Sequence, residues 1–332
     1  MRNKFLICGA MLLPIGVACA DEKPSATVSG FADIIYVMSD ESADAPVGGH
    51  VAGNPNGCTV GSTKNCTEGK FGADGEIDVM ATVGKVTARV DIDVSVAPLT
   101  PTDDSASIEQ AFFAWQFQDN VTLIGGVINN PIGYEANDAP DMDFTSHGLV
   151  YDVLDGQTAL DGSNIAGVAA VVDLGGITVT GALLNDLQQV DEENSLALLA
   201  NASPMEGLEL ELGFVTQADN KDNPKSAEDV VDFNAKYTFA SFVAGIDYLT
   251  AGKIVDSVYD IWGVYQISDA LAVKARLSSI SYEAAGVKDT DATTLYGSWQ
   301  ANDNLLIALE WRNDDNGSTD TDKITAEFIA TF

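Results

Sequence analysis

Positively charged side chains are scarce in this sequence of 332 residues. It has 16 Lys and Arg against 50 Asp and Glu, which gives a net charge of −34 at pH 7. No Lys or Arg lies between Arg89 and Lys221. A chain this acidic repels polyanions, so the composition argues against nucleic acid as a partner. It favours small cations instead.

Histidine and cysteine are also rare, with two and four residues. An enzyme site needs a nucleophile, a base and a group that orients the base. His147 beside Ser146 does not provide this, because neighbours in sequence on a strand or loop point apart. We therefore expect no catalytic residues. Two thiols without nearby histidines make a poor zinc site, and the acidic segment 313–323 departs from the EF-hand pattern, so we expect no metal ion or cofactor.

Long apolar runs are missing except at the amino terminus. Residues 1–20 have a basic start, an apolar centre and small residues at Ala18 and Ala20. This is the layout of a cleaved secretory signal peptide, with lipid attachment at Cys19 as the alternative. Cleavage after Ala20 would leave residues 21–332 as a single domain.

Two cysteines remain after the signal segment, Cys58 and Cys66. In an exported chain we expect them to form a disulfide that closes a short surface loop, worth roughly 2.5 kcal/mol.

The most apolar later stretch, residues 165–184, approaches the length of a membrane helix. Asp173 and a Gly-Gly pair interrupt it, and it is rich in Val, Ile and Thr. These features favour two strands joined by a tight turn.

What the sequence has in abundance is a period of two. In residues 86–96 every second side chain is apolar, while Arg89, Asp91 and Asp93 lie on the opposite face. Other segments repeat the alternation and place four more charged residues on a polar face: Lys274, Arg276, Glu310 and Arg312. Each such segment has two faces that prefer different surroundings.

Sixteen strand-like segments follow one another along the chain. They lie near residues 25–38, 70–83, 86–96, 107–117, 121–128, 164–173, 177–185, 195–203, 208–216, 230–239, 242–249, 258–268, 271–283, 292–300, 305–312 and 323–332. Short and long connections alternate between them. An even number of antiparallel strands, with short turns at one end and long polar loops at the other, is the pattern of a transmembrane β-barrel. In hydrocarbon, strands can pair every backbone group only in a closed sheet.

The final segment, "KITAEFIATF", alternates up to an outward-facing Phe332. It resembles the last strand of bacterial outer-membrane proteins, whose final Phe is read by the barrel-assembly machinery. Together with "AFFAWQF" at 111–117 and "VTLIGGVINNPIGYE" at 121–135, it makes the chain similar to the β-barrel porins of Gram-negative outer membranes. The resemblance implies about sixteen strands, short periplasmic turns, long extracellular loops, contact with outer-membrane lipids and lipopolysaccharide, and a possible homotrimer.

In such porins the third long loop folds into the lumen. Here that connection, 129–163, contains no Lys or Arg, and its first part, 129–148, contains four acids. We expect it to form a pore constriction through Glu135, Asp138, Asp141 and Asp143. The pore wall is then expected to include Arg89, Asp91, Asp93, Lys274, Arg276, Glu310 and Arg312.

The predicted function is a water-filled channel for passive diffusion of small hydrophilic solutes and ions, with a preference for cations. The alternative is a non-conducting structural or adhesive barrel whose acidic loops bind cations. Within the third loop, "HGLVYDVL" at 147–154 is a candidate for an extra strand.

Overall fold

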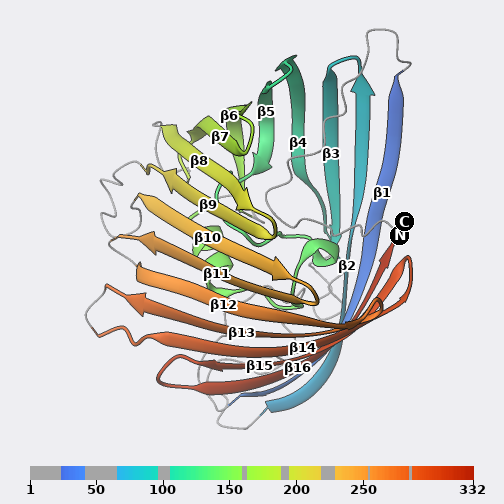
Figure 1. The fold of residues 1–332 in the computed structure, drawn as a ribbon. Helices are drawn as coiled ribbons and strands as arrows, with labels where there is room; N and C mark the ends of the chain where they lie inside the picture. Colours follow the sequence, from blue (N-terminus) through green and yellow to red (C-terminus); the bar gives the residue numbers. More distant parts are fainter. Residues whose placement is uncertain are drawn as a thin grey trace.

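The chain forms a closed antiparallel barrel (Figure 1). The structure is a computed structural model that describes residues 24–41, 66–95, 105–158, 163–187, 194–217, 229–252, 255–283 and 286–332. Within these residues sixteen strands each pair with their neighbours in sequence, and β1 pairs with β16 to close the ring. The expected fold class is confirmed.

The strand bounds lie close to the predicted ones. In chain order the strands are Ser25–Glu41 (β1), Cys66–Val83 (β2), Val86–Ser95 (β3), Ser105–Gln118 (β4), Val121–Asn129 (β5), Asn164–Asp173 (β6), Ile177–Asn185 (β7), Asn194–Met205 (β8), Leu208–Val215 (β9), Val230–Phe239 (β10), Phe242–Ala251 (β11), Val255–Ser268 (β12), Leu271–Tyr282 (β13), Thr290–Asn302 (β14), Leu305–Asp315 (β15) and Asp320–Thr331 (β16).

Connections at the two ends of the barrel differ in length, as predicted. Seven of them, all within the described residues, have only two or three residues. Two connections that were predicted to be long, 250–257 and 313–322, are shorter because the flanking strands continue. β15 runs to Asp315 and pairs there with Asp320 of β16. Backbone pairing persists where the hydrophobic alternation has already stopped, so the pattern underestimates these strands.

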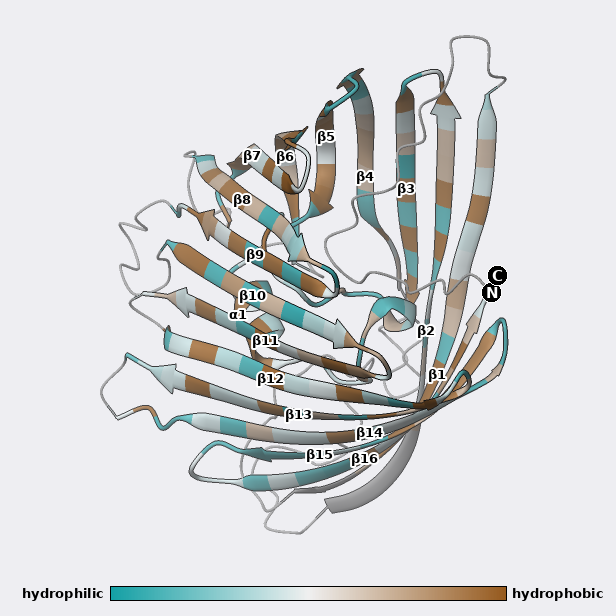
Figure 2. Cartoon of the chain, viewed as in Figure 1, coloured by the Kyte–Doolittle hydropathy of each residue, from teal (hydrophilic) through white to brown (hydrophobic). Residues whose placement is uncertain are grey.

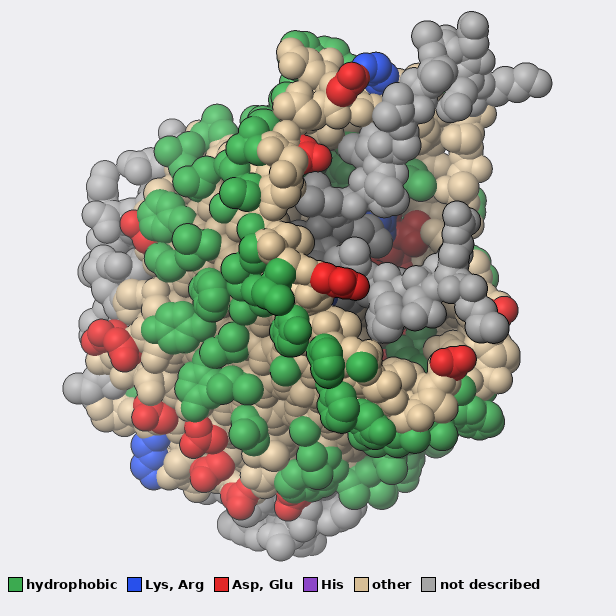
Figure 3. All heavy atoms as spheres, in the orientation of Figure 1, with side chains coloured by type: hydrophobic (Ala, Val, Ile, Leu, Met, Phe, Trp, Pro, Cys, Tyr) green, Lys and Arg blue, Asp and Glu red, His purple; other side chains and the backbone are tan. Residues whose placement is uncertain are grey.

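The outer surface of the barrel is apolar and the inner surface carries most of the charge. On β15, Leu309 is 58% exposed on the outside, whereas Glu310 and Arg312 are 2% and 4% exposed on the inside. Figure 2 shows the resulting bands of alternating hydropathy along the strands. In Figure 3, hydrophobic side chains gather over the outer face of the middle strands, and acidic side chains lie near their ends. This arrangement suits a lipid environment.

Part of the interior is apolar as well. The segment β6–β7, whose sequence approaches a membrane helix in hydrophobicity, turns Ala169, Ala182 and Leu184 inward, where they join a buried apolar cluster with the helix α1 (Leu149–Gly156). Burial on the inner face explains why this pair of strands is apolar on both sides. Among the described residues no helix is long and apolar enough to cross a membrane.

The alternative of an extra strand at 147–154 is wrong, since Leu149–Gly156 is helical. The side chains of Leu149, Val150 and Leu154 are buried in the apolar cluster. Tertiary packing therefore overrides the strand propensity of Val and Tyr in this segment.

The carboxyl terminus completes the ring next to the first strand. The backbone N–H of Phe332 donates to the carbonyl of Gly30 at 3.0 Å, and the N–H of Gly30 donates to the carbonyl of Phe332 at 3.3 Å. The Phe332 side chain is exposed on the outer surface. Its recognition by assembly machinery stays a prediction.

Candidate functional site

The connection between β5 and β6, residues 130–163, is called the lumenal loop here; its described residues, 130–158 and 163, lie inside the barrel. It contains the short 3-10 helix Ala139–Asp141 (η1) and α1. Side chains of β12, β13, β15 and β16 on one side and β4 on the other bind it. The loop therefore reaches across the lumen.

The loop enters the lumen through close packing. Ile132 lies so near Gly213 of β9 that a Cβ there would come within 2.4 Å of it. Gly133 has a φ of +103°, a conformation that L residues rarely adopt. Tyr134 then stacks on Trp262 of β12, with ring centroids 4.6 Å apart. Two glycines and an aromatic pair thus fix the direction in which the loop departs.

Glu135 holds the two arms of the loop together. Its Oε1 lies 3.2 Å from Nδ1 of His147, and its Oε2 accepts the backbone N–H of Gly148 at 2.8 Å and lies 3.4 Å from Nη1 of Arg276. Burial alone would raise the pKa of Glu135, but the charge of Arg276 and the bonds to His147 and Gly148 lower it below its usual value. Glu135 is therefore an ionised anchor of the loop.

Two wall arginines bind the loop backbone directly. Nη2 of Arg276 donates to the carbonyls of Ser146 and His147 at 2.6 and 2.8 Å, and Nη1 of Arg312 donates to the His147 carbonyl at 2.5 Å. The guanidinium of Arg276 also lies 4.5 Å from the centre of the Phe144 ring. Charge-assisted bonds of this kind are stronger than neutral ones.

The same wall offers acceptors for the loop's N–H groups. Oε2 of Glu310 accepts the backbone N–H groups of Thr145 and Ser146 at 2.9 and 3.3 Å. Thr145 also donates its hydroxyl to Glu327 at 2.7 Å. The turn at 145–147 is thus held through both its donors and its acceptors.

Asp260 of β12 caps α1 from another part of the chain. Its two carboxylate oxygens accept the N–H groups of Leu149 and Val150 at 3.2 and 3.1 Å. A carboxylate is favourable at a helix N-terminus because unpaired N–H groups and the helix dipole meet there. Gly148 is needed beside it, since a Cβ there would lie 2.0 Å from Oδ2 of Asp260.

Asp143 faces the β13 side of the lumen. Its Oδ1 lies 3.3 Å from Nζ of Lys274, which also bonds its carbonyl, and its Oδ2 accepts the hydroxyl of Tyr134 at 3.0 Å. Lys274 in turn lies 4.8 Å from the centre of the Tyr296 ring. Asp143 remains partly exposed, with 32% of its side chain accessible, so its charge can act on the lumen.

Asp138 and Asp141 lie on the opposite side of the lumen, near β2, β3 and β4. Burial and the neighbouring charge of Glu109 raise the pKa of Asp138 to about 8. Asn137 ties this arm to the wall by donating to Oε1 of Glu109 at 3.1 Å. Burial also raises the pKa of Asp141, while Arg89 opposes that effect.

Arg89 is the centre of a group of wall carboxylates. Its Nε binds Asp91 at 2.7 Å, and its Nη2 binds Asp78 at 2.8 Å and lies 3.8 Å from Glu76. Asp93 lies in the same group, because β2 and β3 pair Glu76 with Asp93. Acids outnumber bases here, as the composition predicts for the lumen.

The residues singled out from the sequence therefore fall into two groups joined by the loop. One comprises Arg89, Asp91, Asp93, Asp138 and Asp141; the other comprises Glu135, Asp143, Lys274, Arg276, Glu310 and Arg312. The expected disulfide partner Cys58 and the expected signal segment lie outside the described residues, and so does the side chain of Cys66.

Several important residues were missed. Glu76 and Asp78 lie on the polar face of the alternating "EIDVM", so the period of two was a usable signal for them. Trp262 points into the lumen, on a face where the alternation predicts polar residues. The sequence therefore contains no such signal for this tryptophan. Asp260 gave none either, since its partners are about 110 residues away.

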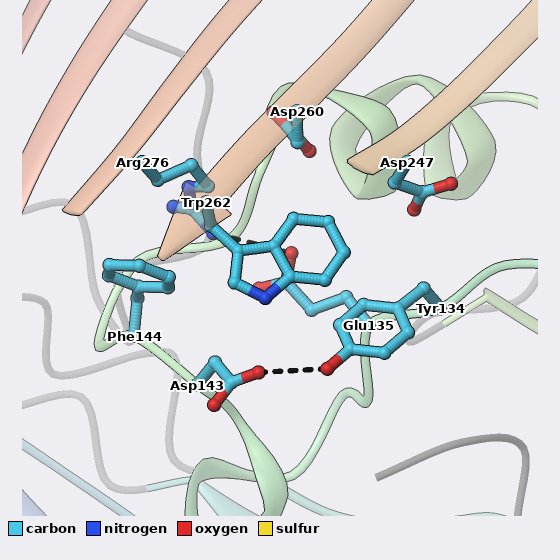
Figure 4. A pocket seen from close by; sticks show the side chains of 8 residues that line it. All are labelled: Tyr134, Glu135, Asp143, Phe144, Asp247, Asp260, Trp262 and Arg276. Carbon is cyan, nitrogen blue, oxygen red and sulfur yellow. Dashed lines mark hydrogen bonds and ion pairs between the residues drawn. The ribbon is translucent and has the colours of Figure 1, made fainter. Parts of the chain in front are cut away.

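A small pocket lies where the loop meets β11, β12 and β13 (Figure 4). The loop and the wall each contribute four lining residues: Tyr134, Glu135, Asp143 and Phe144 from the loop, and Asp247, Asp260, Trp262 and Arg276 from the wall. Figure 4 shows the indole of Trp262 between the Phe144 ring and the Tyr134 ring. Aromatic surfaces and charges of both signs thus meet at one point of the lumen.

Comparison with solved structures relates this architecture to outer-membrane channels. The barrel is similar to a loop-deletion mutant of OmpT, an outer membrane protein of Vibrio cholerae (TM-score 0.61, 12% identity, 92% of this chain and 99% of that chain). It is also similar to a mutant Rh. blastica porin (0.60, 14%, 92% and 100%) and to the outer membrane channel DcaP of Acinetobacter baumannii (0.60, 12%, 93% and 97%). No family model and no curated protein matches the sequence. The chain has the sixteen-stranded fold of the porins.

Proposed function

We propose that the protein is an outer-membrane porin, a channel through which small hydrophilic solutes and ions diffuse passively. The observation that carries this proposal is a closed barrel with an apolar outer face, a charged inner face and a loop anchored across the lumen. The porin fold supports the same assignment. Recognition of Phe332 by assembly machinery, contact with lipopolysaccharide, a homotrimeric state and a lack of enzymatic activity are parts of the proposal.

The channel is proposed to prefer cations. Each basic residue of the two lumenal groups is bound to a carboxylate or to backbone carbonyls. Carboxylates outnumber the basic residues around Arg89, where Glu76, Asp78, Asp91 and Asp93 lie near one guanidinium, and Asp143 on the other side is partly exposed. Negative charge beside a narrow water path attracts cations and repels anions, because low-dielectric walls focus the field.

Conductance tests the proposal directly. Purified protein reconstituted into planar bilayers is expected to give discrete steps of current in KCl. Liposomes that contain the protein are expected to swell in solutions of small neutral sugars. Both follow from a water-filled path. Intact, correctly folded barrels that insert without current or swelling would contradict the proposal and favour a non-conducting structural barrel.

Replacing an outward-facing apolar residue tests the lipid-facing surface. Leu309→Lys is expected to reduce the free energy of unfolding in lipid vesicles by up to about 2–4 kcal/mol, the cost of a lysine near the middle of a bilayer. Leu309 is 58% exposed on β15. Urea unfolding in vesicles, followed by tryptophan fluorescence, gives the measurement.

Leu174→Lys is the matched control, because Leu174 is 63% exposed in the short connection between β6 and β7. Leu174→Lys is expected to reduce the free energy of unfolding much less than Leu309→Lys does. Equal destabilisation by the two substitutions would contradict a lipid-facing Leu309.

A further inference from the structure

Three carboxylates of the wall converge beside the lumenal loop. They are Glu76 of β2, Asp93 of β3 and Glu109 of β4, and one oxygen of each lies within 4.8 Å of the others. Glu76 and Asp93 face each other directly in the pairing of β2 with β3. Three adjacent strands thus bring three negative charges to one place.

Glu109 reaches this place through a β-bulge. In the pairing of β3 with β4, Asp91 faces Gln110 and Ile92 faces Ile108, so Glu109 is an extra residue in β4. Both Glu109 and Gln110 are buried, although consecutive residues of a regular strand point to opposite faces. Bulges re-aim side chains in this way and occur next to functional sites.

One buried oxygen each of Glu109 and Glu76 has no hydrogen-bond donor. Oε1 of Glu109 accepts from Asn137 and Asn164 at 3.1 and 2.9 Å, but its Oε2 is buried and has no hydrogen-bond partner. Oε2 of Glu76, a residue only 2% exposed, likewise has no donor, and the Glu76 side chain lies beside the carboxyl groups of Asp78 and Asp138. A buried carboxylate without a partner is costly unless a positive charge compensates it.

The nearest guanidinium is already engaged. Arg89 binds Asp78 and Asp91 at 2.8 and 2.7 Å and lies 3.8 Å from the other oxygen of Glu76. Of these three ion pairs, the two shortest are therefore with carboxylates outside the group formed by Glu76, Asp93 and Glu109.

We propose that Glu76, Asp93 and Glu109 bind a divalent metal ion of the calcium class. The donors are all oxygens, which hard cations such as Ca²⁺ and Mg²⁺ prefer. Ca²⁺ suits the site better, because it accepts irregular geometry and both monodentate and bidentate carboxylates. Asp138 of the lumenal loop is adjacent to Glu76, so a bound ion would also lower the repulsion between wall and loop. The site does not require that the barrel conduct.

The test is direct binding to the folded, detergent-solubilised protein. Equilibrium dialysis with radioactive calcium is expected to show one saturable site in the wild type, and CaCl2 is expected to raise the thermal unfolding temperature more than NaCl of equal ionic strength. Glu109→Gln is expected to weaken this binding by ~10-fold or more, because it removes one of three ligand charges. Glu206→Gln, at an exposed turn, controls for the many surface acids and is expected to bind as the wild type does.

Calcium binding by Glu109→Gln equal to that of the wild type would overturn the site. So would a thermal response that NaCl reproduces, which would mean screening only, or a complete lack of saturable binding, which would favour a proton shared between Glu76 and Asp138. If Glu109→Gln fails to fold, Asp93→Asn takes its place with the same expectation. Loss of conductance in the wild type would contradict the channel function and leave this result unaffected.

Discussion

Arg276→Gln is expected to release the turn at 145–147 from the wall, giving a larger and noisier single-channel current than the wild type. Arg276 binds the carbonyls of Ser146 and His147 and pairs with Glu135. Because its side chain is 3% exposed, its loss leaves Glu135 buried without its main counter-charge. Removing one partner of a buried pair costs about 3–5 kcal/mol, so the thermal unfolding temperature is expected to fall as well.

Two variants separate anchoring from charge. Arg276→Lys keeps the charge but loses the planar fork that contacts two carbonyls at once, and it is expected to give an intermediate current. Lys323→Gln removes a buried lumenal charge of β16 that pairs with Asp314 of the wall. If Lys323→Gln and Arg276→Gln raise the current equally, Arg276 does not act as an anchor.

The cation preference is expected to increase as the pH rises from 6 to 9. With a pKa raised to about 8, Asp138 is mostly neutral at pH 6 and mostly ionised at pH 9. Ionisation adds a negative charge to the lumen, which favours cations. The permeability ratio of K⁺ to Cl⁻, taken from reversal potentials at each pH, gives the measurement.

Asparagine variants assign the effect to the loop acids. Asp138→Asn is expected to remove most of the pH dependence, and the triple variant with Asp141→Asn and Asp143→Asn is expected to lower the preference at every pH. Asp119→Asn, in an exposed turn at the opposite end of β4, is the control. A pH dependence that survives Asp138→Asn would contradict this assignment.

The barrel was predictable because strand pairing imposes a period of two on every segment. In β16 apolar and polar residues alternate, and this alternation predicts which face is outside. The structure agrees, with Ile324, Ala326 and Phe328 outside and Lys323, Thr325 and Glu327 inside. Local signals suffice for this, since each strand meets the same two environments.

The contacts of the lumenal loop were not predictable in the same way. Asp260 caps α1 although about 110 residues separate them in sequence, and no short pattern contains that information. The strand-like segment at 147–154 became a helix because this cap and the apolar cluster stabilise it.

At Glu109 a single extra residue in β4 makes the prediction from the alternation wrong. Counting by twos from Phe113, Trp115 and Phe117, which are all exposed on the outside, places Glu109 outside too. The bulge in β4 turns it inward instead. Pattern arguments fail where the backbone departs from regular pairing, and in this barrel that departure builds the carboxylate group of the proposed ion site.

The most direct test of the central claim is the reversal potential of the wild-type channel across a planar bilayer with a KCl gradient at pH 7.5. The anchored loop and the excess of lumenal carboxylates predict a reversal potential with the same sign as the equilibrium potential of K⁺. A reversal potential with the same sign as the equilibrium potential of Cl⁻ would contradict a cation-preferring channel.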